Sequence, residues 1–249
     1  METIVTNGLV IQQTNYAEAD RILHIFTEKL GIVSVIAKGA RKYKSHQGAP
    51  SQLLYYSSFT LVSGKQMYTL RGASGITSFF SLSESLEKLA LCTYLFDITK
   101  ALVPSNLPEN NVLSLLLNTL YILQNKQRSI SLIKAVYELK LLSLSGFMVS
   151  CSECSSCGKN GSFDAYFSPS NGTIVCDKCN RAPDCVRISD ATRMAMEYII
   201  SNDTEKIFSF KISDESLEEL GCVSEKFLLN CSERNFLSLS YYKSLYDGK

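Results

Sequence analysis

The sequence contains no tryptophan and only 2 histidines among its 249 residues. Histidine is the side chain most often used in general acid–base catalysis, and neither His24 nor His46 has an obvious acidic neighbour. The phosphate-loop pattern G-x-x-x-x-G-K-[ST], the nucleophile motif G-x-S-x-G and the metalloprotease motif H-E-x-x-H are also missing. These absences remove the usual grounds for predicting catalysis, so we expect a protein that is not an enzyme.

Long apolar runs are missing as well, because no stretch reaches the roughly 18 residues that a membrane-spanning helix needs. The opening residues METIVTNGLV have no basic segment followed by an apolar core, so they do not resemble a secretory signal. The sequence therefore predicts a cytoplasmic protein without a membrane partner. Cytosolic thiols are kept reduced, so closely spaced cysteines favour metal binding or catalysis over disulfides.

A strong overall charge is absent too, since the net charge is only +1. The charge is nevertheless unevenly distributed. Residues 1–80 carry eight Lys or Arg against four Asp or Glu, which gives this region a net charge of +4. A basic N-terminal region is consistent with a face that binds a polyanion, although many solvated surfaces are basic.

The first 80 residues are rich in β-branched residues and alternate apolar with polar positions, as strands do. Five strands with short links and a basic loop after the third predict a small, nearly closed barrel. Strand number alone leaves two candidates, the oligonucleotide/oligosaccharide-binding fold (OB-fold) and an SH3-like barrel. The predicted strands cover residues 3–14, 21–28, 31–39, 53–64 and 66–74.

Apolar residues recur at helical spacing from about residue 83, where we place the first helix start at Ser83. Further helices are predicted over 110–125, 129–147, 189–201, 213–232 and 234–246. The expected fold class is therefore α+β and multidomain. An OB-fold barrel occupies residues 1–80, and a helical domain occupies 81–249 with a cysteine-rich module inserted at about 150–185.

Five of the 9 cysteines fall within residues 151–179. Two C-x-x-C pairs, separated by 18 residues, have the spacing of a four-thiolate zinc site with Cys154, Cys157, Cys176 and Cys179 as ligands. Gly158 follows the first pair and Asn180 follows the second, and both residue types tolerate the left-handed backbone needed there. Four thiolates fill the coordination of zinc, so such a site is structural rather than catalytic.

Alternatives to this ligand set remain open from the sequence. Cys151 creates a competing register with Cys154, and Cys185 is a second spare cysteine. The pairs could also be a redox site or disulfides. Outside the module, the remaining cysteines lie singly in apolar helical segments, so we predict small core residues at Cys92, Cys222 and Cys231.

The segment IVSVIAKGARKYKSHQG combines a strand end with clustered positive charge around an aromatic residue. Such a loop can neutralise several phosphates, while Tyr43 can stack on an unpaired base. Arg21 and Arg71 can add to the same face. The simpler alternative is a solvated loop that binds nothing. The predicted DNA-binding residues are Lys38, Arg41, Lys42, Lys44, Arg71 and Tyr43.

The order of these features resembles the RecO family of recombination mediators. The resemblance rests on TNYAEADRILHIFTEKLGIVSVIAKGARKYKS, on the later YELKLLSLSGF helix and on CSSCG followed by GTIVCDKC. It covers essentially the whole chain, but the C-terminal helices match only in type, and Cys151 is an extra cysteine.

The resemblance implies an N-terminal OB-fold, a helical domain and one structural zinc ion per chain. It implies a bacterial, cytoplasmic, nucleoid-associated protein of DNA repair, recombination and the response to DNA damage. Such proteins bind single- and double-stranded DNA, anneal complementary strands and help load RecA onto DNA coated by single-strand-binding protein (SSB). The implied protein partners are RecR, the acidic C-terminal tail of SSB and, in some bacteria, RecF.

The SSB tail, an acidic peptide ending in an apolar residue, would need a cation beside an apolar groove of the helical domain. Lys134 and Lys140 are weak candidates, and the ordinary alternative is two solvated lysines. Two competing functions also stay open. One is a zinc-containing interaction adaptor that binds no DNA, and the other is a thiol or metal enzyme that uses the C-x-x-C pairs.

Overall fold

The computed structural model of the chain describes residues 2–41, 48–125, 128–147, 149–163, 165–179 and 184–245. The chain forms two compact units, one made of residues 1–114 and 240–249 and the other of residues 115–239. The change from strands to helices falls near residue 80, as the sequence indicates. The domain division at residues 80 and 81 stays a prediction.

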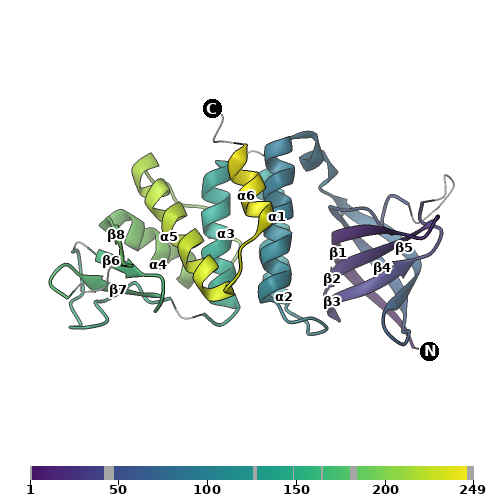
Figure 1. Cartoon of the computed structure of the whole chain (residues 1–249), viewed down its shortest axis with the longest axis horizontal. Coiled ribbons are helices and arrows are strands. Elements are labelled where there is room, and N and C mark those ends of the chain that lie inside the picture. The colour runs from purple at the N-terminus through teal and green to yellow at the C-terminus, as the bar shows by residue number, and fades with distance from the viewer. Residues whose placement is uncertain are drawn as a thin grey trace. The chain divides into compact units, whose positions relative to one another are not determined.

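Five strands form a closed barrel in the first unit, in the order β1-β2-β3-β5-β4, and β1 pairs with β4 to close it (Figure 1). The neighbours are antiparallel except for β3 and β5, where Val35 lies opposite Tyr68 and Ile36 lies opposite Thr69. This connectivity is that of the OB-fold, so the predicted OB-type barrel is confirmed and the SH3-like alternative is excluded. The strands are β1 (Thr3–Tyr16), β2 (Asp20–Thr27), β3 (Gly31–Ala37), β4 (Tyr55–Val62) and β5 (Tyr68–Ser78).

Alternate side chains of these strands fill the barrel, because successive residues of a strand point to opposite faces. The interior includes Leu23, Ile25, Val33, Val35 and Leu70, all of which are buried. The other side chains of β2 and β3 point outward, and their burial changes along the strands. Phe26 and Ile32 are buried, the pair Ile22 and Ile36 is partly buried, and Lys38 just beyond β3 is exposed.

One end of the outer face is covered by the chain that follows helix α1 (Leu86–Leu102). The amide of Asn106 donates to the carbonyl oxygen of Ile32 at 3.1 Å. Gly31 has a φ of +67°, and a Cβ atom there would lie 2.0 Å from the carbonyl oxygen of Leu107. Only glycine therefore permits this close approach. Lys100 of α1 donates to the Gln12 side chain at 2.8 Å, which fixes the helix beside β1.

The start of α1 differs from the prediction. A 3₁₀ helix, η1 (Phe80–Glu84), occupies the residues around Ser83. The N-cap is Ser85, whose hydroxyl accepts from the amide of Lys88 at 3.4 Å. Both serines have acidic and apolar residues after them, so the sequence pattern alone could not separate the two positions.

The helical unit is built around α3, where every residue from Leu132 to Leu142 is buried. Helices α4 and α5 pack against it and against each other. The helices are α2 (Asn110–Gln124), α3 (Ile130–Leu144), α4 (Asp190–Ser201), α5 (Asp214–Ser232) and α6 (Leu237–Ser244), and the unit boundaries fall within α2 and α6. The sequence predicts these helices well. Cys92 is buried as predicted, whereas Cys222 is exposed because it lies on the solvent side of α5.

The cysteine-rich module contains a small antiparallel sheet between α3 and α4 in sequence. The residues FDAYFSPSNGTIV between the two C-x-x-C pairs predict a strand–turn–strand hairpin, and it is present as β6 (Ala165–Ser168) and β7 (Thr173–Cys176). A third strand, β8 (Val186–Ile188), pairs with β6 and was not predicted, because three residues are too few to show a period.

Candidate functional site

Four cysteine sulfurs meet in the module, and they come from two separate turns. Cys154 and Cys157 precede β6, whereas Cys176 ends β7 and Cys179 follows it. All four sulfur atoms lie within 4.8 Å of one another. The sulfurs of Cys157 and Cys176 are 3.9 Å apart, close to the edge of about 3.8 Å expected for a tetrahedron with Zn–S bonds near 2.3 Å.

Backbone hydrogen bonds shape both turns. The amide of Gly158 donates to the carbonyl oxygen of Cys154 at 2.8 Å, and the amide of Cys179 donates to that of Cys176 at 3.0 Å. Gly158 has a φ of +71°, as predicted for the residue after the second ligand of a pair. Asn180, predicted to have the same role in the second turn, lies outside the described residues.

The donor set fits a metal that prefers thiolates. The amide of Cys176 donates to the Cys154 sulfur at 3.3 Å. Burial acts to raise the pKa of Cys154. The hydrogen bond from the Cys176 amide and further backbone amide hydrogen bonds outweigh burial and lower the pKa to about 6. The pKa of Cys179 rises to about 12, because its thiol is hydrogen-bonded to Cys157 and Cys176. A bound metal would replace the remaining protons on the sulfurs.

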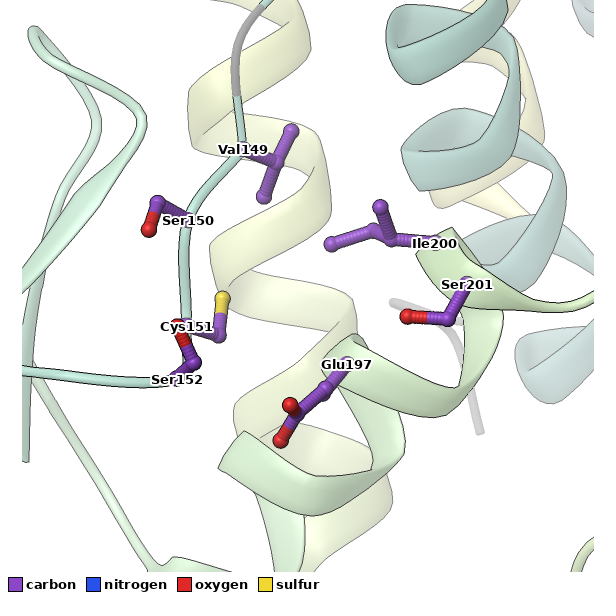
Figure 2. Close-up of a pocket in the computed structure, with 7 residues that line it drawn as sticks. All are labelled: Val149, Ser150, Cys151, Ser152, Glu197, Ile200 and Ser201. Atoms are coloured by element: carbon purple, nitrogen blue, oxygen red, sulfur yellow. The ribbon is translucent and has the colours of Figure 1, made fainter. Parts of the chain in front are cut away.

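Cys151 does not join the four sulfurs. It lies in a cavity of about 130 Å³ that is also lined by Val149, Glu197 and Ile200 (Figure 2). Burial, and secondarily the charge of Glu197, raise the pKa of Cys151 to about 12, so the thiol stays protonated. Cys185 also lies outside the four-sulfur group found among the described residues.

Arg193 joins the module to α4 and was not singled out from the sequence. Its guanidinium donates to the carbonyl oxygen of Cys151 at 3.0 Å and to the carboxylate of Asp190 at 2.8 Å. It also lies 6.0 Å from the ring of Phe163. The spacing of Asp190 and Arg193 indicates a helical ion pair, but nothing in the sequence shows the contact with residue 151.

Positive side chains gather at one end of the barrel, where the β1–β2 turn meets the loop after β3. Arg41 donates to the carbonyl oxygens of Ala17 and Glu18, at 3.3 and 3.1 Å. Lys38 is exposed, and Arg71 is exposed on β5 beside the inward-pointing Leu70. Lys42, Tyr43 and Lys44 lie outside the described residues, so the structure places only part of the predicted set.

Comparison with known proteins matches the chain to two family models. The family described as "Recombination protein O N terminal" matches residues 1–79, and "Recombination protein O C terminal" matches residues 83–240. The DNA repair protein RecO of Acetivibrio thermocellus is 37% identical over 98% of this chain and 98% of its own length. The chain belongs to the RecO family.

Other RecO proteins align over nearly the full chain as well. The DNA repair protein RecO of Alkaliphilus metalliredigens is 30% identical over 97% of this chain and 99% of its own length. That of Clostridium perfringens is 30% identical over 98% of both. Within the described ranges, no helix of this RecO family member is long and apolar enough to cross a membrane.

The lysines that we predicted to contact the SSB tail lie inside the helical unit of this RecO family member. Lys134 is 7% exposed and forms ion pairs with Glu138 and Glu225 at 2.8 and 2.9 Å. Lys140 is 6% exposed and donates to the carbonyl oxygens of Ile200 and Asn202. Neither is a solvated lysine. Contact with a peptide stays a prediction for both, and it requires the peptide to displace these partners.

A separate hollow of the helical unit has a cation beside apolar side chains. Ile122, Phe208 and Arg128 line it, together with Glu205 and Ser209. Arg128 is held in place because its Nε atom donates to the carbonyl oxygen of Phe208 at 2.7 Å.

Proposed function

We propose that this chain is a recombination mediator of DNA repair rather than an enzyme. In this proposal it binds single- and double-stranded DNA, anneals complementary strands and assists the loading of RecA onto SSB-coated DNA. The observation that carries the proposal is the OB-fold barrel of a RecO family member with Lys38, Arg41 and Arg71 near one end.

The placement of these cations suits binding of DNA that does not depend on its nucleotide sequence. Contacts with phosphates supply affinity but carry no sequence information. Annealing requires such contacts, because a protein must screen the phosphates of two strands while their base edges stay free to pair. We assign phosphate binding to Lys38, Arg41, Lys42, Lys44 and Arg71, and base stacking to Tyr43.

The four-cysteine cluster is proposed to hold one structural zinc ion. The ligands would be Cys154, Cys157, Cys176 and Cys179, whose sulfur spacing supports tetrahedral coordination. With all four positions filled by protein, the ion would have no open site for water or substrate. Its role is to fix the turns on either side of the β6–β7 hairpin.

RecR, RecF and the SSB tail are proposed partners at the nucleoid. The hollow beside Arg128 supports tail binding, because an arginine next to Ile122 and Phe208 offers both a charge and an apolar surface. Glu205 lines the same hollow, and its carboxylate repels an acidic peptide. Arg128→Ala should therefore weaken binding of a labelled acidic peptide, whereas Glu205→Gln should strengthen it.

The salt dependence of DNA binding tests the main proposal. Replacing Lys38 and Lys44 by alanine should weaken binding of a labelled single strand and flatten the slope of log K against log salt by about 1.4, the value for two phosphate contacts. The matched control is Lys211→Ala with Lys226→Ala, which removes the same charge from exposed positions in the helical unit.

Three results separate the competing functions. An unchanged slope in the Lys38 and Lys44 variant would remove these residues from the binding site. A wild-type protein that ignores oligonucleotides in dilute buffer would favour an interaction adaptor. A metal-free protein whose C-x-x-C pairs form reversible disulfides would favour a thiol enzyme.

A further inference from the structure

A cavity of about 130 Å³ lies in the helical unit, between the chain that enters the cysteine module and the C-terminal part of α4. Residues 149–152 line it on the module side, and Glu197, Ile200 and Ser201 line it on the helix side (Figure 2). None of these residues belongs to the four-cysteine cluster. Since a cavity of about 150 Å³ can hold a benzene molecule, this one has room for a short aliphatic chain. The Glu197 side chain is 47% exposed, so a ligand can enter from solvent.

The two ends of this cavity differ in polarity. Figure 2 shows the side chains of Val149 and Ile200 extending toward each other at one end. At the other end the Glu197 carboxylate extends toward the chain at Cys151, and the Ser201 hydroxyl points into the space between the two segments. A ligand that fills the cavity therefore needs an apolar stem and a polar head.

The charges around the cavity favour a positively charged head. Among the described residues that line it, none is basic and Glu197 carries a carboxylate. The guanidinium of Arg193 lies 3.5 Å from that carboxylate, but it also donates to Asp190 at 2.8 Å and to the carbonyl oxygen of Cys151 at 3.0 Å. One cation shared between two carboxylates leaves a net negative charge, which a cationic ligand would neutralise.

The end of α4 favours a cation for a second reason. Carbonyl groups at the C-terminus of a helix carry a partial negative charge. The amine of Lys140 donates to the carbonyl oxygens of Ile200 and Asn202, at 2.9 and 2.7 Å, so this helix end already binds one ammonium group. Burial lowers the pKa of that amine, while the charge of Asp203 acts in the opposite direction. Its positive charge is therefore partly offset.

We propose that this cavity binds an aliphatic primary ammonium group, the group carried by a lysine side chain and by a free polyamine. The ammonium would donate to the Glu197 carboxylate and the Ser201 hydroxyl, while its methylene groups pack on Val149 and Ile200. Three diverging donors suit these separate acceptors better than the planar fork of a guanidinium. A divalent metal ion would find one carboxylate and would leave the apolar end unused. The site goes beyond the proposed function, because a positively charged ligand is not a nucleic acid.

Methyl NMR of the full-length protein, labelled at isoleucine and valine, tests this site. The methyl signals of Val149 and Ile200 report from the apolar end of the cavity. Butylammonium chloride should shift both signals at roughly millimolar concentrations, the range expected for a ligand with so few atoms. Butanol keeps the chain and lacks the charge, so it should bind at least about tenfold more weakly. Sodium butyrate carries the opposite charge and should shift neither signal.

Two variants assign the contacts. Glu197→Gln should weaken butylammonium binding about tenfold or more, since a hydrogen bond to a charged group contributes on this scale. Ser201→Ala should weaken it about threefold, the scale of a hydrogen bond to a neutral group. Ser201 forms no ion pair with Arg193, so its variant tests the site even where Glu197→Gln alters the fold. The matched control is Glu218→Gln, which removes the same charge from an exposed position of α5 and should leave binding unchanged.

Two further ligands distinguish the sources of the ammonium group. Tighter binding of a capped tripeptide with a central lysine would assign the site to a partner protein, and tighter binding of 1,4-diaminobutane would assign it to a free polyamine. Three results would overturn the proposal: no shift of the Val149 and Ile200 signals with any of these amines, equal binding of butanol and butylammonium, or wild-type affinity in both Glu197→Gln and Ser201→Ala. None of them affects the proposed function, which depends on DNA binding by the barrel.

Discussion

At the scale of single residues, the position of a charge decides whether it is available to a ligand. Lys38 is exposed beyond the end of β3, whereas Arg41 already bonds two carbonyl oxygens of the β1–β2 turn. Lys134 is enclosed by helices and paired with two glutamates. The three residues look alike in the sequence, yet within the described part of the chain only Lys38 is exposed and engaged with no such partner, so we expect it to matter most for DNA affinity.

His24 gives the barrel a dependence on pH. Its pKa is lowered from the usual 6.5, first because it is partly buried and second because Lys100 is nearby. Between the lowered pKa and 6.5 the unfolded chain binds more protons than the folded one, so protons favour unfolding. The stability that comes from a neutral His24 is complete above pH 6.5 and declines as the pH falls toward the folded pKa.

Urea unfolding of wild type and His24→Gln between pH 5 and 7.5 measures this effect. The stability of wild type should fall more steeply on acidification than that of the variant, because glutamine does not titrate. Ser34 contacts the ring, Gln12 lies opposite His24 on β1, and Lys100 is paired with Asp97; all of these residues stay in both proteins. Parallel curves for the two proteins would contradict the prediction.

At the scale of elements, local sequence signals were sufficient for most helices and strands. The segment SDATRMAMEYIIS predicts a helix that begins with Ser189-Asp190 as its cap, and in α4 the hydroxyl of the N-cap Ser189 accepts from the amide of Thr192. The module hairpin followed from the strand–turn–strand pattern between the C-x-x-C pairs, and the four-sulfur cluster followed from the spacing of the cysteines. Contacts between residues that are far apart in the sequence could not be predicted. Lys134, for example, pairs with Glu225, which lies 91 residues further along the chain.

Removing one member of the ionic cluster between α3 and α5 should lower the free energy of unfolding. Glu138 is fully buried, pairs with Lys134 and accepts from the Ser224 hydroxyl at 2.7 Å. Burial acts to lower the pKa of Lys134, but both glutamates outweigh it and the pKa is raised, so the amine stays charged. Lys134→Met would leave Glu138 without its cation, and we expect a loss of about 3–5 kcal/mol in unfolding free energy.

Chemical denaturation of the full chain measures this loss, and two further variants serve as controls. Lys226→Met, at an exposed position of α5, should change stability by less than about 0.5 kcal/mol. The double variant Lys134→Met with Glu138→Leu should recover most of the loss, because it removes the unpaired charge as well. A single variant as stable as wild type would show that the ion pairs contribute nothing.

At the scale of the whole molecule, the sequence predicted a β-barrel followed by helices, but it did not predict how the strands pair to close the barrel. Strand number left the OB-fold and an SH3-like barrel undecided. The parallel contact of β3 with β5 and the return of β4 to β1 decided it. Both are pairings between strands that are far apart in the sequence. The apolar periodicity of a strand and the residues of its turns carry no information on such pairings. The attachment of the module through Arg193 and Cys151 is non-local in the same way.

The separation of the chain into two compact units leads to a prediction about zinc. The four sulfurs belong to the helical unit, whereas the basic residues Lys38, Arg41 and Arg71 belong to the barrel unit, which has its own core. Elemental analysis should find one zinc per chain in wild type and in Cys151→Ser, and none in Cys176→Ser. Loss of zinc should lower the stability of the helical unit by about 3 kcal/mol or more.

The barrel should be unaffected by this loss, because the buried residues of its core cluster all come from the segment between Val10 and Leu70. Single-strand affinity of Cys176→Ser at low salt and at a temperature below its unfolding transition should therefore stay within about twofold of wild type, while its first thermal transition moves down. Cys151→Ser is the matched control, since it removes a buried thiol three residues before Cys154 and leaves the four sulfurs intact. A large loss of affinity in Cys176→Ser alone would mean that the metal module takes part in DNA binding, and the division of labour between the two units would have to be abandoned.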